Sequence, residues 1–493
     1  MQLTLNTRSL ADYRTFLKVK SLPLYRVHGS TVEFPDEYMG RMGIEVRQQA
    51  AVAYEPSKFL FDYQKAIAAM AIRKRKFAIF ADCGLGKTLI YHEFASHAAR
   101  ALGDRRCILM VAPLMVVEQT LAEYHRWYNG DSHWEPIPAN KLATWLREGS
   151  GRFGITNFEA LTDDLEPGRL GGMIVDESSM LKSHYGKWGQ TILRLGRGLE
   201  WKLAGTGTPA PNDRIEFANH AVFLNAETNV NSFLARYFVN RSETVDRWTM
   251  KAHAIRPFYR SLAHWSIFLT NPATYGWHDH AGDIPPINVH IHSVPMTDGQ
   301  NDAVQLVTGK LIATDAGGIG MRSKLGQIAK GNLAGRAIAT NKPAFIRGLV
   351  ESWPTESTII WCIYNAEQRS MEATFPAAAS ITGDTPHEQR MRIIDDFKAG
   401  RQRVLITKPK ILGFGLNLQV ATRQVFSGLQ DSYESYYQAV KRSNRVGSTR
   451  PLNVHIPLTD AERPMVENVL DKAHRVQSDT EEQERIFRAN AAI

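Results

Sequence analysis

The sequence predicts an α/β protein with two parallel-sheet lobes in tandem behind a small N-terminal extension. In the first half, the apolar run 77–80 leads into a glycine-rich turn, and the apolar run 173–175 ends in two carboxylates. In the second half, the runs 358–363 and 404–407 repeat this alternation without a second glycine-rich turn of that kind. Short apolar runs are typical of strands that are buried on both faces of a parallel sheet.

The turn after the first run, residues 82–88, reads Asp-Cys-Gly-Leu-Gly-Lys-Thr. Gly84 and Gly86 can adopt backbone angles that direct successive N–H groups at phosphate oxygens. Lys87 would neutralise the β- and γ-phosphates of a nucleotide, and the Thr88 hydroxyl would bind Mg2+. A helix beginning near Lys87 would point its positive end at the same phosphates. The turn is therefore a candidate phosphate-binding loop.

The second run ends in Asp176 and Glu177. A carboxylate at Asp176 can reach Mg2+ through water, and one at Glu177 can polarise an attacking water molecule. Because a metal held by a hydroxyl needs a carboxylate partner, this pair supports the phosphate-binding loop even though Ala81 replaces the glycine that usually opens it. A chance Gly-Lys-Thr turn and an ordinary acidic strand cap are the alternatives.

A further strand end is followed by the segment 203–212, which reads Leu-Ala-Gly-Thr-Gly-Thr-Pro-Ala-Pro-Asn. Its glycines, threonines and prolines predict a tight, rigid loop at the edge of the sheet. Such a loop can hydrogen-bond the neighbouring acidic strand and sense the γ-phosphate, although a plain turn would have the same composition.

In the second half, residues 437–447 predict a helix that ends in glycine. Gln438, Arg442 and Arg445 are spaced i, i+4 and i+7, so one helical face would carry all three side chains. Arginine suits bidentate contact with a γ-phosphate from across a cleft, which is the geometry of an arginine finger supplied within one chain. The alternative is a solvated basic face on this helix.

The order of these blocks resembles that of superfamily-two helicases, and in particular of bacterial or phage Swi/Snf-type ATP-dependent DNA translocases, over residues 54–475. The resemblance implies two RecA-like lobes, with ATP and Mg2+ as cofactors. It also implies that Gln64 contacts adenine, with Phe59 or Phe61 stacking nearby. Residues 413–419 resemble the Gly-x-Gly-x-Asn-Leu block of the second lobe.

The candidate site residues fall into three groups. The candidate catalytic residues are Lys87, Asp176, Glu177, Arg442 and Arg445. The candidate nucleotide-binding residues are Gln64, Asp82, Gly84, Leu85, Gly86, Lys87, Thr88, Gly413 and Gly415. The candidate Mg2+ ligands are Thr88 and Asp176.

The chain departs from the family's pattern at several positions. Gly205 stands where the Thr-Gly-Thr-Pro block usually has a leading Leu, and Ser179 stands where the acidic block often has His or Asp. Coupling between ATP and nucleic acid through Ser179 would therefore differ. Residues 408–412 are bulkier than the small Ala/Gly run expected before Gly413.

The resemblance implies an ATPase motor that translocates on or remodels duplex or branched DNA, with a role in DNA repair or recombination. A grip on phosphates rather than bases would make its binding independent of sequence and sensitive to salt. The net charge of +9 agrees with such a polyanionic partner. An RNA helicase and an ATP-binding regulatory subunit with weak turnover stay open as alternatives.

The composition is that of a soluble globular chain, with 493 residues, 43% hydrophobic and 22% charged. This length is enough for about two to four domains. No apolar run approaches the ~18 residues of a membrane span, and the N-terminus has no signal-peptide pattern. The three cysteines lie in expected strands or in the phosphate loop, which suits a reducing compartment. We expect a monomer in the cytoplasm, associated with the nucleoid or in a host cell, without membrane contact.

The expected domains are a small N-terminal module over 1–50, a first lobe over 51–283, a second lobe over 284–480 and a tail over 481–493. Within the module, residues 10–17 predict a helix and residues 25–34 a hairpin. The module either touches DNA or only packs on the first lobe. Two prolines after Ile284 predict the hinge between the lobes, because neither can donate to a sheet or continue a helix.

Overall fold

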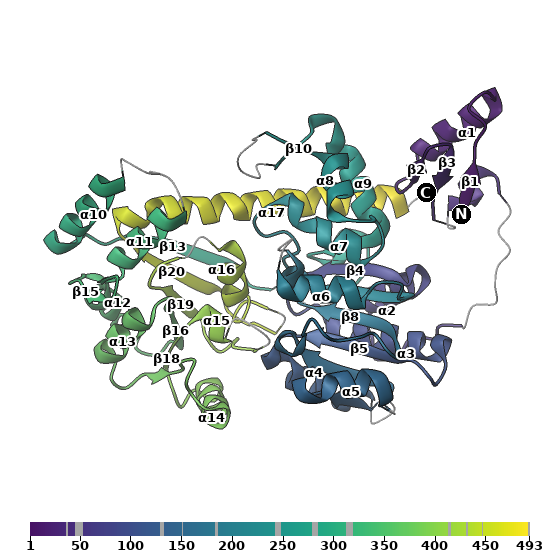
Figure 1. Ribbon diagram of the computed structural model, residues 1–493. Helices are drawn as coiled ribbons and strands as arrows, with labels where there is room; N and C mark the ends of the chain where they lie inside the picture. The colour runs from purple at the N-terminus through teal and green to yellow at the C-terminus, as the bar shows by residue number, and fades with distance from the viewer. Residues whose placement is uncertain are drawn as a thin grey trace. The chain divides into compact units, whose positions relative to one another are not determined.

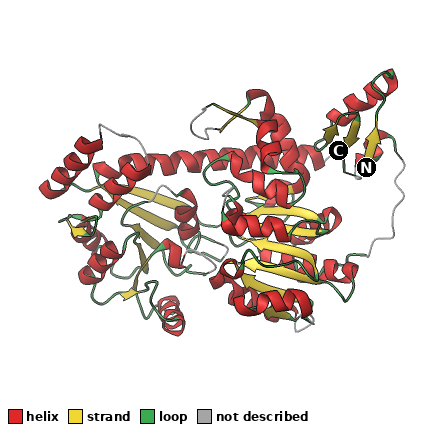
Figure 2. Cartoon of the chain, in the orientation of Figure 1, coloured by secondary structure: helices red, strands yellow, loops and turns green. Residues whose placement is uncertain are grey.

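The computed structural model describes residues 1–35, 38–44, 53–128, 133–149, 151–182, 186–241, 248–278, 284–311, 319–412, 416–429, 432–445 and 447–491. The chain divides into two compact units. The first unit contains residues 1–82, 86–279 and 478–493, and the second contains residues 83–85 and 280–477. Each unit is built on one parallel sheet with helices between its strands (Figures 1 and 2). The predicted fold class, two parallel-sheet lobes in tandem, is thus confirmed.

The sheet of the first unit has the strand order β12-β4-β9-β8-β5-β7-β6, and its described strands are all parallel. The strands are β4 (Lys76–Ala81), β5 (Cys107–Ala112), β6 (Trp134–Pro136), β7 (Phe153–Asn157), β8 (Leu170–Asp176), β9 (Trp201–Gly205) and β12 (Ser266–Leu269). The helices are α2 (Asp62–Lys74), α3 (Lys87–Leu102), α4 (Leu114–Tyr128), α5 (Ala139–Glu148), α6 (Lys187–Leu195), α7 (Phe217–Phe223), α8 (Val230–Tyr237) and α9 (Ile255–Trp265). The strands β10 (Phe238–Asn240) and β11 (Trp248–Met250) pair in an antiparallel arrangement.

The central strands of this sheet are continuous apolar runs because both of their faces are covered. All of β5 and β8 is buried, and so is β4 after its first residue. The apolar runs 77–80 and 173–175 lie in β4 and β8, as predicted. Strand β9 lies between them, and its last residue, Gly205, is in register with Ile79 and with Asp176. The carboxyl ends of the three strands therefore meet at Gly205.

Residues 1–35 and 38–44 contribute side chains to the core of the first unit. The strands β1 (Gln2–Thr4), β2 (Arg26–His28) and β3 (Thr31–Glu33) form an antiparallel sheet beside α1 (Leu10–Lys20). The predicted hairpin is confirmed, and Gly29 in its turn has a left-handed φ of 59°. Val32 and Phe34 belong to the same hydrophobic cluster as Trp265. The Arg26 guanidinium also donates a hydrogen bond of 2.8 Å to the carbonyl oxygen of Asn225.

The sheet of the second unit has the order β13-β20-β19-β16-β18-β17, again with all described strands parallel. The strands are β13 (Ile287–Ser293), β16 (Thr358–Trp361), β17 (Ala379–Ser380), β18 (Val404–Thr407), β19 (Arg423–Phe426) and β20 (Leu452–Leu458), and a small hairpin joins β14 (Asn332–Leu333) to β15 (Arg336–Ala337). The helices are α10 (Asp298–Leu311), α11 (Ile319–Ala329), α12 (Lys342–Glu351), α13 (Asn365–Thr374), α14 (His387–Lys398), α15 (Pro409–Leu412), α16 (Tyr433–Val440) and α17 (Arg463–Ala491).

Helix α17 runs without a break through residue 480, where the sequence had suggested the end of the second lobe (Figure 1). Its residues from Ser478 onward belong to the first unit. There, the Asp479 carboxylate accepts hydrogen bonds of 2.9 Å from the guanidinium of Arg214 and 2.8 Å from the Tyr259 hydroxyl. Among the described residues, no helix is both long and apolar enough to cross a membrane.

Candidate functional site

The glycine-rich turn joins the end of β4 to the start of α3, two elements of the first unit. Gly84 and Gly86 both have left-handed backbone angles, with φ of 89° and 65°. A residue with a side chain rarely adopts these angles, so the two glycines are needed for the shape of the loop. Leu85 between them is buried at 3% exposure. Gly86 is the N-cap of α3, which places the positive end of the helix at the loop.

Gln64 packs directly against this loop from α2. Its side chain is 2% exposed, and its Oε1 accepts a 2.9 Å hydrogen bond from the backbone N–H of Phe61. Its Nε2 lies 3.5 Å from the carbonyl oxygen of Gly86. A Cβ atom on Gly86 would approach Nε2 to 2.2 Å, so any side chain there would displace the glutamine. The residue that the resemblance assigns to adenine is therefore held beside the loop.

The side chain of Lys87 folds back over the glycine-rich turn. Its Nζ donates hydrogen bonds of 2.8 Å to the carbonyl oxygen of Ala81 and 3.3 Å to that of Asp82. The half-buried Thr88 follows it, and its hydroxyl has no side-chain hydrogen bond among the residues that the structure describes. An ammonium, a hydroxyl and a helix N-terminus around two left-handed glycines fit the oxygens of a nucleotide phosphate.

Asp176, at the end of β8, is a buried carboxylate with 7% exposure. Its Oδ1 accepts a 3.0 Å hydrogen bond from the hydroxyl of Tyr91, a fully buried residue of α3. Burial raises the pKa of Asp176, while the positive charge of Lys87 and the Tyr91 hydrogen bond act in the opposite direction. Burial also raises the pKa of Tyr91, and the charges of Asp176 and Glu177 add to this effect, so the phenol stays protonated and donates.

Glu177 follows Asp176 in a strained conformation, with a positive φ of 49°. Its Oε2 accepts a 3.1 Å hydrogen bond from the hydroxyl of Thr206, and Thr206 in turn accepts one of 3.2 Å from the backbone N–H of Thr208. The segment 203–212 therefore does bond to the acidic strand end, as the sequence predicted. The strained backbone and this hydrogen bond together fix the direction of the Glu177 side chain.

The next two residues, Ser178 and Ser179, are both fully buried. The Ser179 hydroxyl lies 3.5 Å from the carbonyl oxygen of Glu177, so its hydrogen bond stays within the same turn. Ser178 instead reaches α7, where its hydroxyl lies 3.0 Å from Nε2 of His220. Burial lowers the pKa of His220 to about 4, so the imidazole is neutral and its Nε2 can accept a hydrogen bond from the Ser178 hydroxyl. In this structure the longer-range contact of the acidic block runs through Ser178.

The donor set also fits Mg2+. The described residues contain no group of three or more His, Cys, Asp or Glu side chains that could hold a metal by themselves. Mg2+ is usually bound through one or two carboxylates, several waters and the phosphates of a substrate, so it does not need such a group. Thr88 and Asp176 would be its protein ligands here, and the bound ion would neutralise phosphate charge.

In the second unit, the predicted helix over 437–447 is wrong in its second half. Helix α16 ends at Val440, and the chain continues in turns. Ser443 and Asn444 leave the helix because their side chains have tertiary partners: Ser443 accepts a 2.8 Å hydrogen bond from Gln424, and Asn444 donates one of 2.6 Å to the carbonyl oxygen of Pro285. Gln438 therefore lies on α16, whereas the two arginines lie beyond it.

These two arginines differ in their surroundings. Arg442 is 3% exposed, and its Nε has no hydrogen-bond partner among the described atoms. Arg445 is half-buried, and its guanidinium donates to the side chain of Asn417. Gly413 and Gly415, the remaining candidates of this unit, lie outside the described residues.

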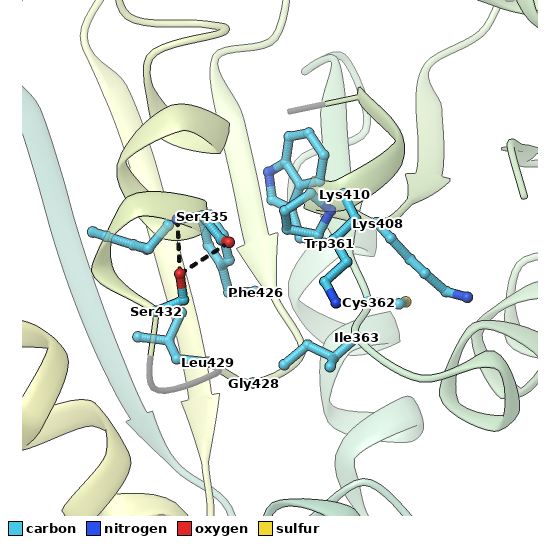
Figure 3. Close-up of a pocket in the computed structure, with 12 residues that line it drawn as sticks. Trp361, Cys362, Ile363, Lys408, Lys410, Phe426, Gly428, Leu429, Ser432 and Ser435 are labelled. Carbon is cyan, nitrogen blue, oxygen red and sulfur yellow. Dashed lines mark hydrogen bonds between the residues drawn. The ribbon is translucent and has the colours of Figure 1, made fainter. Parts of the chain in front are cut away.

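A basic pocket opens at the carboxyl edge of the second sheet (Figure 3). Lys408 and Lys410 line it from the end of β18 and from α15, opposite Ser432 and Ser435 of the α16 N-terminus. Ser432 caps this helix, and its oxygen accepts a 3.3 Å hydrogen bond from the backbone N–H of Ser435. The bulky run 408–412 thus folds into a short helix, and its first three residues form one wall of the pocket.

Sequence reasoning missed two residues of the first unit, Tyr91 and His220. A helical turn separates Tyr91 from Lys87, so the 3.6-residue period alone places both on one face of α3. That signal was present in the sequence. The contact of His220 with Ser178 joins residues 42 positions apart and has no local signal.

Two family models match the chain. The one described as "Type III restriction enzyme, res subunit" matches residues 57–190, which belong to the first unit except for 83–85, and contains the phosphate loop and the acidic pair. The one described as "Helicase conserved C-terminal domain" matches residues 341–447, in the second unit, and contains Arg442 and Arg445.

A stretch of 80 residues is 35% identical to the ATP-dependent helicase fft1 of Schizosaccharomyces pombe, and it spans 16% of this chain and 8% of that protein. Among solved structures, the SWI2/SNF2 ATPase core of Sulfolobus solfataricus in complex with dsDNA is similar at 18% identity and a TM-score of 0.40, over 89% of this chain and 97% of that one. One family model therefore matches on each of the two parallel sheets, and the model matched on the second sheet is a helicase domain.

Proposed function

We propose that this chain hydrolyses ATP and uses the free energy to translocate on, or remodel, duplex or branched DNA. One observation carries the proposal: the carboxyl ends of β4, β8 and β9 bring a phosphate-type loop, the Asp176 carboxylate and the Glu177–Thr206 pair to one edge of a parallel sheet. Nucleotides bind at this edge in open parallel sheets. A protein that only stored a nucleotide would not need a strained, hydrogen-bonded carboxylate next to the metal ligand.

Each residue has a stated part in this proposal. The loop 82–88 and Lys87 bind the phosphates, Thr88 and Asp176 hold Mg2+, and Glu177 orients the attacking water. Gln64 contacts the adenine. Of the two phenylalanines near it, Phe59 stacks on Trp127 with ring centroids 5.1 Å apart, and Phe61 stacks on Tyr63 at 5.9 Å. Phe61 is the more exposed of the two, at 40%, which favours it as the stacking partner of the base.

Arg442 and Arg445 complete the proposed ATPase from the second unit. Their guanidiniums would contact the γ-phosphate and stabilise the charge that develops during its transfer. The buried Nε of Arg442 has no hydrogen-bond partner among the described atoms. Because buried donors are usually paired, this supports the proposal that its acceptor arrives with the nucleotide. On the resemblance alone, we also propose that Gly413 and Gly415 contact the nucleotide.

DNA is the proposed partner because the chain carries a net charge of +9 and a basic pocket at the carboxyl edge of its second sheet. The similarity to an ATP-dependent helicase over 80 residues supports a nucleic-acid partner. We further propose that residues 1–50 touch DNA and that the prolines after Ile284 act as the hinge between lobes. Contact through phosphates would make the binding sequence-independent and steeply salt-dependent.

The test is the ATPase rate in the presence of single-stranded, duplex or forked DNA, or RNA. We expect duplex or forked DNA to stimulate hydrolysis most, and Lys87→Ala and Glu177→Gln each to abolish the stimulated rate. Glu159→Gln, which changes an exposed carboxylate in the same unit, is the control and should leave the rate unchanged. Stimulation by RNA alone would replace the DNA motor by an RNA helicase. Full activity in Lys87→Ala would overturn the assignment of the loop.

A further inference from the structure

Tyr91 contacts two of the three strands that carry the proposed catalytic edge, β8 and β9. It is 0% exposed, and it lies on α3 one helical turn after Lys87. Its hydroxyl donates a 3.0 Å hydrogen bond to Oδ1 of Asp176, at the end of β8. Its ring lies directly over Gly205, at the end of β9. One side chain therefore spans two neighbouring strand ends.

Gly205 is a glycine because of the space that Tyr91 occupies. A Cβ atom built on Gly205 would lie 1.7 Å from the tyrosine oxygen and 2.6 Å from the ring carbon that bears it. Gly205 is not one of the described glycines that have a positive φ, so a residue with a side chain could adopt its backbone conformation. The Leu that the family's block usually has at this position would thus collide with the phenol, and the chain carries Tyr91 and Gly205 as a matched pair.

The hydrogen bond occupies one of the two oxygens of Asp176. A buried carboxylate with one oxygen held by a fixed donor cannot rotate freely about its terminal torsion, so the other oxygen keeps one direction. Asp176 and Thr88 are the only protein groups in the proposed Mg2+ set, so this direction matters for the ion. Gly205 also directly precedes Thr206, the hydrogen-bond donor to Glu177, so the ring packs against the start of the loop that holds the second carboxylate.

We propose that Tyr91 is a positioning residue for Asp176, whose hydroxyl fixes one carboxylate oxygen so that the other is aimed at the Mg2+ that accompanies the nucleotide. The proposal rests on the proposed function, since it concerns the metal of the same site. Tyr91 itself touches neither the nucleotide nor the metal in this arrangement. Groups that orient a metal ligand in this way typically change metal affinity by about 10–100-fold when they are removed.

The first experiment is Tyr91→Phe, which keeps the ring over Gly205 and removes only the hydroxyl. ADP binding is measured by calorimetry with excess Mg2+ and again with EDTA. We expect the factor by which Mg2+ strengthens ADP binding to fall about tenfold or more, with ADP binding in EDTA unchanged. Tyr124→Phe is the matched control, because its buried hydroxyl contacts the sulfur of Met110 and should leave the Mg2+ effect intact.

The outcomes separate the two proposals. An unchanged Mg2+ effect in Tyr91→Phe overturns the positioning role while leaving the ATPase in place. Absence of ADP binding in the unmodified protein overturns the proposed function itself. Loss of ADP binding in EDTA by Tyr91→Phe would mean that the hydroxyl supports the whole loop, and it would overturn the specific role at Asp176.

The matched pair gives a second, independent test. Gly205→Leu alone should lower the thermal unfolding temperature of the protein sharply, because the new side chain collides with Tyr91. Combined with Tyr91→Ala, which empties that space, Gly205→Leu should cost much less, and the difference is the coupling energy of a double-mutant cycle. Additive losses in the double variant would contradict the pairing of the two positions.

Discussion

The hydroxyl of Thr206 donates a hydrogen bond to Oε2 of Glu177 over 3.1 Å, and so links the loop after β9 to the carboxylate after β8. Thr206 is fully buried, and its own oxygen is fixed by the backbone N–H of Thr208. The carboxylate proposed to orient water thus depends on a chain of two hydrogen bonds from a rigid loop. Movement of that loop would change the direction of the Glu177 side chain without changing the phosphate-binding loop 82–88.

Thr206→Val should therefore lower kcat of the ATPase about tenfold or more while nucleotide affinity stays nearly unchanged, because a hydrogen bond to a charged group contributes roughly 1.5–3 kcal/mol. Steady-state kinetics and nucleotide titration measure the two quantities. Thr208→Val is the control, since the buried hydroxyl of Thr208 has no hydrogen-bond partner among the described atoms. Equal losses of activity in both variants would mean that the loop responds only to the loss of a polar group.

Arg445→Ala should bind nucleotide normally and lose turnover by about 10^3-fold, the magnitude typical of an arginine that stabilises phosphoryl transfer. The measurement is single-turnover ATP hydrolysis with DNA at saturation. Arg450→Ala is the matched control, because Arg450 is exposed and pairs with Glu356 at 2.5 Å. Turnover near that of the unmodified protein in Arg445→Ala would show that the finger is misassigned.

Lys410→Glu should weaken duplex binding and reduce the slope of log affinity against log salt by about 1, because one phosphate contact is lost. Basal ATP hydrolysis without DNA should not change. Fluorescence anisotropy over a salt series gives both values. Lys398→Glu makes the same charge change at an exposed position of α14 and serves as the comparison. Identical salt slopes in the two variants would remove the pocket of Figure 3 from the DNA surface.

Glu462→Gln should destabilise the second unit by about 3–5 kcal/mol, because it leaves two buried ammoniums without a counter-charge. Lys330 and Lys342 both pair with Glu462, and each of the three side chains is 1% exposed. Urea unfolding followed by tryptophan fluorescence measures the loss. Asp460→Asn, an exposed change in the same turn, should cost little.

The same triad predicts an acid dependence. Burial alone would raise the pKa of Glu462, but the two ammoniums outweigh it and hold the pKa below its ordinary value of 4.5. The folded state then binds the proton less tightly than the unfolded state does. The stabilisation that the ionised Glu462 provides is complete above pH 4.5, and it is lost as the pH falls through the lower pKa of the folded state. Glu462→Gln should abolish this part of the acid profile.

Lys202→Met should change how stability depends on alkaline pH. Burial, with a contribution from the charge of Lys76, lowers the pKa of Lys202 from 10.5 to about 8. The unfolded chain binds this proton more tightly, so the cost of the charge is full below pH 8 and disappears as pH approaches 10.5. Across that window, the free energy of unfolding of the unmodified protein should rise by about 2–3 kcal/mol relative to that of Lys202→Met. The free energies of unfolding of the two proteins are measured with urea at several pH values between 8 and 10.5. A difference between the two proteins that stays constant over this range would contradict the prediction.

The sequence predicted the parts of the site whose chemistry is local. The turn 82–88 needs glycines, a lysine and a threonine in fixed order, and Asp176 with Glu177 follows an unmistakable apolar run, so both could be recognised before the fold was known. The hydrogen bond from Thr206 to Glu177 was expected because both lie at strand ends. These inferences required only short-range patterns.

Other features depend on contacts that a local pattern does not contain. The end of α16 at Val440 could not be predicted, since a basic 3.6-residue spacing continues past it and only the distant partners Gln424 and Pro285 draw the chain away. The pairing of Tyr91 with Gly205 requires knowing that β9 lies beside β8. Each half of that pair looks unremarkable alone, and in the sequence the glycine is only a departure from the family's pattern.

The ion pair between Arg214 and Asp479 joins residues 265 positions apart, and Ile486 belongs to the core cluster of the first unit. A ribosome that adds about 5–20 residues per second needs roughly 13–50 s to pass from one partner to the other. During that time the N-terminal half of the nascent chain is present without the last piece of its own interior. Its folding is therefore completed only after the segment that contains Asp479 and Ile486 has been synthesised, and a chain that stops before this segment would leave the first unit without part of its core.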